Sequence, residues 1–113
     1  MEIVKRLVDI LGFKLVAYIA KVQDTKIVER WMSGDELPEV DILVKFALAF
    51  TFADCIGRTN SNEVARVWFM GVKEGVLPEG MSPARLLHIG GDPIVLCGHL
   101  MAMYQDSVAV GAV

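Results

Sequence analysis

The chain has 113 residues and a formal charge of −3 at neutral pH, and 54% of its residues are hydrophobic. A chain of this length can bury one core without disulfides or metal ions. The apolar fraction exceeds what so small a protein can hide, so the sequence predicts an interface with another chain. Its apolar stretches fall short of the roughly 20 residues that a membrane span needs, so we expect no membrane partner. Residues 1–13 lack a signal-peptide pattern, and we expect a cytoplasmic protein.

The charges are unevenly distributed along the chain. Residues 1–38 contain six Lys or Arg and six Asp or Glu, whereas residues 39–113 contain five and eight. A DNA contact made by the neutral N-terminal region would be weak for each protomer. We therefore expect a homodimer or a higher hetero-oligomer.

The first 38 residues predict three short helices. Apolar residues at i, i+4 and i+8 indicate a helix over residues 2–11, which Gly12 ends. A second helix is predicted over residues 13–22. Asp24 is a typical N-cap for a third helix, because its carboxylate accepts free N–H groups of the first turn, and Gly34 ends that helix.

The second and third helices are joined by a turn of about three residues. This arrangement is typical of a helix-turn-helix, whose second helix enters the major groove of DNA. Trp31 falls on the inward face of the third helix and is predicted to lie in the core. Three helices that pack only for stability are the alternative. The residues predicted to contact phosphates or base edges are Thr25, Lys26, Glu29 and Arg30.

The rest of the chain predicts further helices and no strand. Residues 40–57 are apolar almost all round, which favours a central helix buried on several faces. Asn60 and Glu63 form a possible capping box ahead of the next helix. The two cysteines, Cys55 and Cys97, lie in apolar stretches without metal or redox spacing, so we expect two buried, reduced thiols.

Two Pro-containing caps follow. Ser82 precedes Pro83, and Asp92 precedes Pro93, so each pair predicts an N-cap with proline in the first helical position. The last helix is predicted to run to Tyr104 or Gln105. The sequence therefore predicts an all-α fold.

The residues of the N-terminal region resemble a known family. Residues 11–38 are similar to the Xre-like helix-turn-helix of toxin-neutralising antitoxins of the MbcA/ParS/Xre group. In that pattern an Ile-Ala pair ends the second helix and a Trp closes the third before Gly and Pro. The matching residues are Ile19, Ala20, Trp31, Gly34 and Pro38.

The resemblance continues through the C-terminal part. Trp68, Phe69 and Gly71 match the WF-x-G signature of the family's toxin-binding region, and residues 82–87 (SPARLL) resemble its second signature. The Gly-Asp start of the last helix is also similar. Trp68 and Phe69 are expected in the core. The resemblance divides the chain into a helix-turn-helix region (1–38), a central buried helix (39–58) and a toxin-binding helical region with a C-terminal tail (59–113).

The resemblance implies the antitoxin of a type II toxin-antitoxin system. Members of the family bind a RES-domain toxin that consumes NAD, block its active site, and commonly repress their own operon through operator DNA. A stand-alone helix-turn-helix transcriptional regulator and an oligomeric adaptor without DNA binding are the alternatives.

The resemblance also gives the C-terminal segment a role, because family members occlude the toxin's NAD pocket with it. Without the resemblance, the composition of this uncharged segment, residues 107–113, predicts a frayed terminus. Extended, seven residues reach roughly 23 Å, which is enough to enter a cleft. The segment predicted to bind the toxin is Ser107, Val108, Ala109, Val110, Gly111, Ala112 and Val113.

Catalysis is not expected. Cys97 and His99 are two residues apart, so on a helix their side chains diverge and cannot form a nucleophile and base pair. His88 has no second ligand at metal-binding spacing. We therefore expect neither an enzyme nor a metal or other cofactor.

Overall fold

A computed structural model describes residues 1–77 and 79–113, and these residues form seven α-helices. The fold is all-α, as predicted. No helix in this part of the chain is long and apolar enough to cross a membrane. The helices are α1 (Glu2–Leu11), α2 (Phe13–Ala20), α3 (Thr25–Ser33), α4 (Val40–Thr59), α5 (Asn62–Met70), α6 (Pro83–Ile89) and α7 (Pro93–Ala109).

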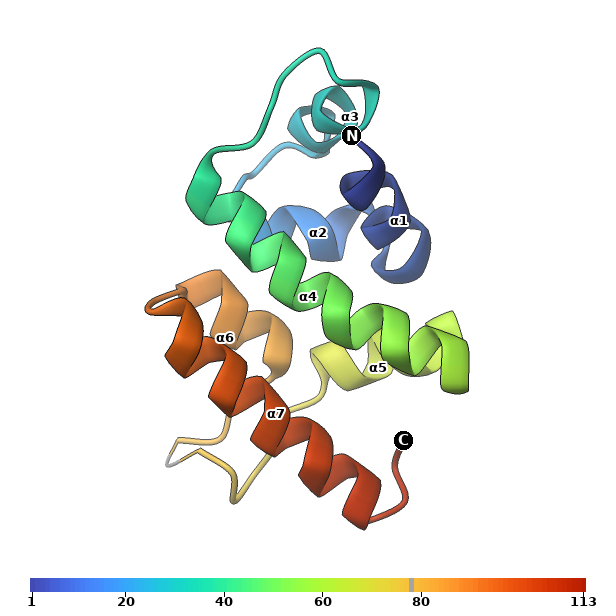
Figure 1. The fold of residues 1–113 in the computed structure, drawn as a ribbon, viewed down its shortest axis with the longest axis vertical. Helices are drawn as coiled ribbons and strands as arrows, with labels where there is room; N and C mark the ends of the chain where they lie inside the picture. Colours follow the sequence, from blue (N-terminus) through green and yellow to red (C-terminus); the bar gives the residue numbers. More distant parts are fainter. Residues whose placement is uncertain (78) are drawn as a thin grey trace.

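Helix α4 organises the molecule. It crosses the middle, with α1, α2 and α3 toward one end and α6 and α7 toward the other (Figure 1). Contacts between α1 and α5 and between α2 and α6 join the two ends directly. The N-terminal and C-terminal regions therefore share one body.

Side-chain caps begin most of the later helices. The predicted caps are confirmed for α3, α6 and α7, where Asp24, Ser82 and Asp92 accept hydrogen bonds from first-turn N–H groups. For α5 the predicted capping box at Asn60 is wrong. Ser61 Oγ accepts from the N–H of Val64 at 3.1 Å, so the helix begins one residue later than a cap at Asn60 implies.

Two residues with positive φ shape the N-terminal turns. Gly12, at φ 87°, alone separates α1 from α2, a conformation that glycine adopts without steric cost. Lys21, at φ 61°, ends α2. The N–H groups of Lys21 and Val22 donate to the carbonyls of Tyr18 and Ala17, which closes the last turn. The predicted helix over 13–22 is therefore two residues too long.

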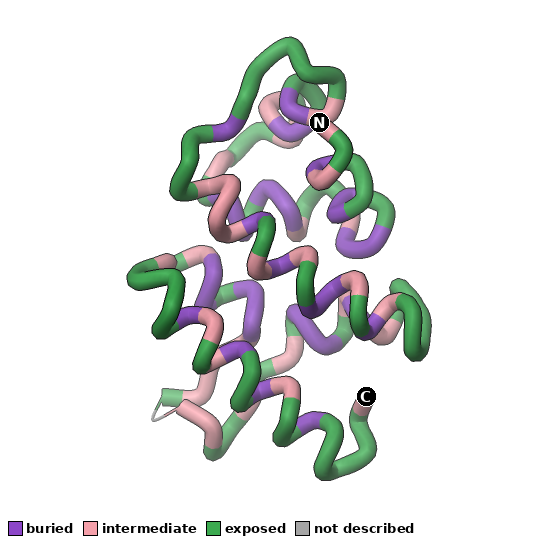
Figure 2. Tube along the Cα trace, viewed as in Figure 1, coloured by how far each residue is buried: buried purple, intermediate pink, exposed green. Residues whose placement is uncertain are grey.

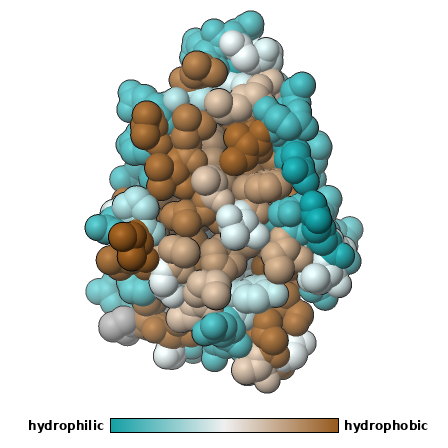
Figure 3. All heavy atoms as spheres, viewed as in Figure 1, coloured by the Kyte–Doolittle hydropathy of each residue, from teal (hydrophilic) through white to brown (hydrophobic). Residues whose placement is uncertain are grey.

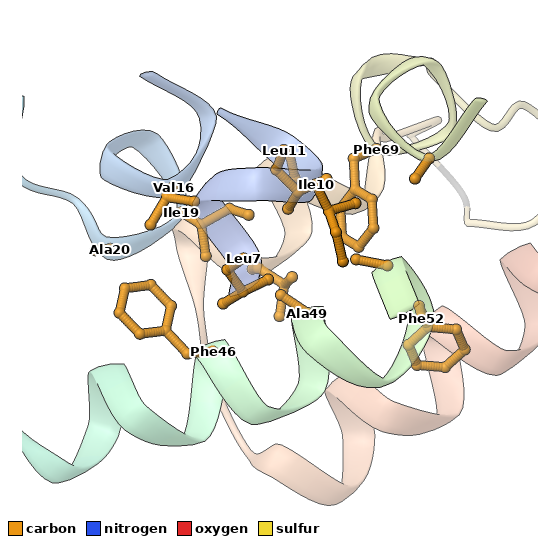
Figure 4. Close-up of a cluster of buried hydrophobic side chains, with 14 of the residues drawn as sticks. Leu7, Ile10, Leu11, Val16, Ile19, Ala20, Phe46, Ala49, Phe52 and Phe69 are labelled. Atoms are coloured by element: carbon orange, nitrogen blue, oxygen red, sulfur yellow. The ribbon is translucent and has the colours of Figure 1, made fainter. Parts of the chain in front are cut away.

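The core lies between α4 and the N-terminal helices and continues to α5. Phe46 points toward Val16 and Ile19 of α2, and Ala49 lies beside Leu7 of α1 (Figure 4). Trp31 of α3 packs edge-on against Phe46, with ring centroids 5.8 Å apart. The first three helices therefore depend on α4 for their burial.

Helix α4 is not buried on several faces, as its composition had predicted. Its buried residues share one side, and the opposite side carries exposed residues such as Ala47 and Thr51 (Figure 2). Cys55 is also exposed, so the prediction of two buried thiols is wrong. The other helices are too few to cover α4 all round.

Helix α7 runs four to five residues further than predicted and ends at Ala109. Ser107 is 4% exposed. Its Oγ accepts a 2.8 Å hydrogen bond from Trp68 Nε1 and donates to the carbonyl of Met103 at 2.9 Å. This contact with α5 anchors the last turn of the helix.

Candidate functional site

The predicted DNA-contacting residues all lie on α3. Lys26, Glu29 and Arg30 are exposed, whereas Thr25 is half-buried in the first turn. Val28 and Trp31 hold the opposite side of α3 in the core. Helices α2 and α3 are in contact and are joined by residues 21–24, and the polar side of α3 is exposed.

The surroundings of α3 are acidic. Arg30 Nη1 lies 3.4 Å from Glu36 Oε1, so one of the two α3 cations already has a carboxylate partner. Residues 21–41 contain three cations and six carboxylates, a formal charge of −3. The cations are Lys21, Lys26 and Arg30, and the carboxylates are Asp24, Glu29, Asp35, Glu36, Glu39 and Asp41. This balance weakens attraction to a phosphate backbone.

The predicted tail is not one extended segment. Ser107 is in the core, and Val108 and Ala109 complete the last turn of α7. Beyond the helix, the N–H of Ala112 donates to the carbonyl of Ser107 at 2.9 Å, and Val113 packs partly against the core. Only residues 110–113 lie outside the helix, and they turn back toward α5.

The WF-x-G signature lies in α5 and just after it. Trp68 and Phe69 are buried, at 3% and 0% exposure. Gly71 lies in a tight position, because a Cβ there would be 3.0 Å from Lys73 Nζ and 3.2 Å from the carbonyl oxygen of Val67, so a larger residue would displace a neighbour. Lys73 Nζ lies 5.6 Å from the centre of the Trp68 ring, and burial lowers the pKa of this ammonium group.

An apolar strip flanks this signature. Val67 and Met70 are 67% and 59% exposed on the outer side of α5, and Val72 is also exposed. Beside them lies a hollow of about 380 Å³, lined by Trp68 and by Ala112 of the tail among others. We call Val67, Met70 and Val72 the α5 strip. This exposed surface was not predicted from the sequence. The signal for it is that α5 has more apolar residues than its inward face can hold.

The SPARLL segment is explained by packing. Ser82 caps α6, and Ala84, Leu86 and Leu87 are buried. At the end of α6 the ring of His88 stacks on Tyr18, with centroids 4.2 Å apart, and its Nδ1 contacts the carbonyl oxygen of Tyr18. This segment therefore fastens the C-terminal region to α2.

Lys45 strengthens the same junction. Its Nζ donates to the carbonyl oxygens of Ile19 at 3.5 Å and His88 at 3.2 Å, so one ammonium group joins the ends of α2 and α6. Burial lowers the pKa of Lys45, Lys21 lowers it further, and Asp41 opposes the shift. Cations are favourable at helix C-termini because they meet free carbonyl groups.

Comparisons with family models, curated proteins and solved structures found no match. Among the described residues, no three His, Cys, Asp or Glu side chains gather where they could hold a metal ion. The candidate site consists of two exposed surfaces: the α3 face, and the α5 strip with residues 110–113.

Proposed function

We propose that this chain is the antitoxin of a type II toxin-antitoxin pair and that it binds and inhibits a RES-type, NAD-consuming toxin. The α5 strip carries the proposal. Three large apolar side chains are exposed directly beside the signature that resembles the toxin-binding region. An exposed apolar patch of this kind is typical of a protein interface.

In this proposal the α5 strip and the tail have separate tasks. The strip docks on the rim of the toxin through apolar contact, while Lys73 and Glu63 at the neighbouring hollow supply charges of both signs for orientation. Residues 110–113 extend into the toxin's NAD cleft. Four extended residues span about 14 Å, so the docking site must lie close to the cleft.

The experiment is co-expression of the chain with the product of the neighbouring reading frame, which this proposal expects to be a RES-domain toxin, followed by growth, co-purification and cellular NAD measurements. Wild type restores growth and co-purifies with the toxin. Deletion of residues 110–113 keeps the complex but releases NAD consumption, since the docking strip is intact. Met70→Glu weakens co-purification because it buries a charge at the interface.

Leu37→Glu is the matched control, since Leu37 is also an exposed apolar residue, at 71%, and lies before α4. It leaves rescue and co-purification unchanged. Complete inhibition by the truncated chain would assign inhibition to the helical body. Absence of any complex with the RES toxin would reject the antitoxin proposal.

A second activity, binding to operator DNA, is favoured by the exposed Lys26 and Arg30 on α3. In an antitoxin this activity represses the operon; alone, it makes the chain a transcriptional regulator. Because the region is acidic, we propose that DNA binding requires an assembly with at least two α3 helices. A chain that retards its promoter DNA without binding the toxin is the regulator.

A further inference from the structure

Helices α4 and α7 together present an exposed apolar face. The two helices are in contact and lie side by side at the front of the molecule (Figure 1). Over them the surface is mostly apolar, with hydrophilic residues gathered toward its margins (Figure 3). We define the α4–α7 face by its exposed residues Val40, Ala47, Thr51, Ile94, Gly98 and Met101.

Charged residues are excluded from the centre of this face. Between Asp41 and Asp54, the one charged residue of α4 is Lys45, which turns inward to the carbonyl groups of Ile19 and His88. Between Asp92 and Asp106 of α7 there is none. When the side of a helix faces water over three turns or more, that side normally carries charged or polar residues. The composition of the α4–α7 face is that of a covered surface.

Gly98 gives an independent indication. It lies in the middle of α7, where glycine costs about 0.5 to 1 kcal/mol of stability relative to alanine. No described residue requires it, because a Cβ at this position would have no neighbour within 4 Å among them. The space is open on the outer side, beside Met101 and near Ile94 on the same stripe. A glycine there lets the backbone of a second molecule approach closely.

We propose that the α4–α7 face is covered by the same face of a second copy of this chain, related by a two-fold axis. In a two-fold contact the residues nearest the axis meet their own copies, so a charge at the centre of the face would repel its copy, and this face has none at its centre. The α5 strip differs, because its hollow is lined by Lys73 and Glu63, which can select a different protein.

The size of the face fits this occupant. Helices of 20 and 17 residues are about 30 and 25 Å long. Packed about 10 Å apart, they present a projected footprint of about 500 Å². Side-chain relief increases the accessible area toward the roughly 800 Å² that each partner of a stable complex buries.

The test measures the mass of the isolated chain by sedimentation equilibrium across micromolar concentrations, so it does not require the toxin. Met101→Glu is compared with Met70→Glu, since both methionines are exposed, at 43% and 59%. Wild type and Met70→Glu are dimers. Met101→Glu raises the dissociation constant at least about tenfold, because each copy then buries an unpaired carboxylate in the interface.

Gly98→Leu tests close approach separately from charge. It keeps the face apolar and favours the helix, yet it weakens the dimer because the added side chain holds the two backbones apart. Circular dichroism checks that each variant retains its helices. A monomeric wild type overturns the proposal, as does a dimer lost in Met70→Glu but kept in Met101→Glu. A dimer unaffected by Gly98→Leu also overturns the close packing of α7.

Discussion

Helices α3 and α7 begin with the same kind of cap, but their exposed sides differ in chemistry: that of α3 is charged and that of α7 is apolar. In each, an aspartate accepts a hydrogen bond from the N–H two residues on, at 2.9 Å for Asp24 and 2.8 Å for Asp92. Each then buries one side in the core. Outward, α3 exposes charged residues such as Lys26 and Glu29, whereas α7 exposes residues such as Ile94 and Met101.

The comparison separates two kinds of information in one chain. Local chemistry decides where a helix begins, since the cap and the first-turn N–H groups are neighbours in sequence. The charge and polarity of the exposed side determine which solvent or partner surface the helix can contact. A charged face suits water or a polyanion, while a large apolar face is typical of a surface that another molecule covers.

The largest expected effect concerns the inner face of α3. Trp31→Ala should lower the free energy of unfolding by about 3 to 5 kcal/mol, because it leaves a cavity against Phe46. Met101→Ala, on the outer face of α7, should change the stability of the monomer by at most about 0.5 kcal/mol. Chemical denaturation at low protein concentration measures both. A small loss in Trp31→Ala would contradict its place in the core.

The next effect concerns the outer face of α3. Replacing both Lys26 and Arg30 with alanine should weaken binding to the chain's promoter DNA by about 1 to 3 kcal/mol if they read bases. Glu36→Gln should strengthen it, because it frees Arg30 and removes a negative charge. Gel shifts at fixed salt measure both variants, and Val67→Ala, an exposed position outside α3 and the α4–α7 face, is the control. An unchanged shift in the double variant would show that α3 is not the reader.

The sequence predicted the fold wherever the decisive contacts are local. The all-α class and the starts of α3, α6 and α7 are confirmed, because a cap and its N–H partner lie within three residues of each other. The inward side of α3 also followed from spacing, and Trp31 is 5% exposed.

The sequence failed where distant residues decide. Helix α7 passes Gln105 because Ser107 meets Trp68, which is 39 positions away, and no periodicity in either helix predicts that hydrogen bond. In α4, the apolar composition is the same whether a neighbour covers a side chain or not, so Cys55 was expected to be buried, although it is exposed. The exposure of Val67 in the α5 strip was not predicted for the same reason, because an apolar side chain on a helix can be either covered or exposed.

The smallest expected effect tests the shared start of α3 and α7. Asp24→Ala and Asp92→Ala should each lower the free energy of unfolding by about 1 kcal/mol, since each removes a cap and a favourable charge at the helix N-terminus. Asp92 also contacts the N–H of Val95 at 3.4 Å, so its loss should be at least as large.

The corresponding asparagine variants are the controls, because the amide oxygen keeps the cap without the charge, and each should recover most of the loss. Thermal and chemical denaturation measure all four proteins in the Met101→Glu background and at low protein concentration, where self-association is weakened. If Asp24→Ala lowers stability and Asp92→Ala does not, Pro93 and the packing of α7 on α4 and α6 are sufficient to start that helix. The two helices would then differ at their starts as well as on their outer faces.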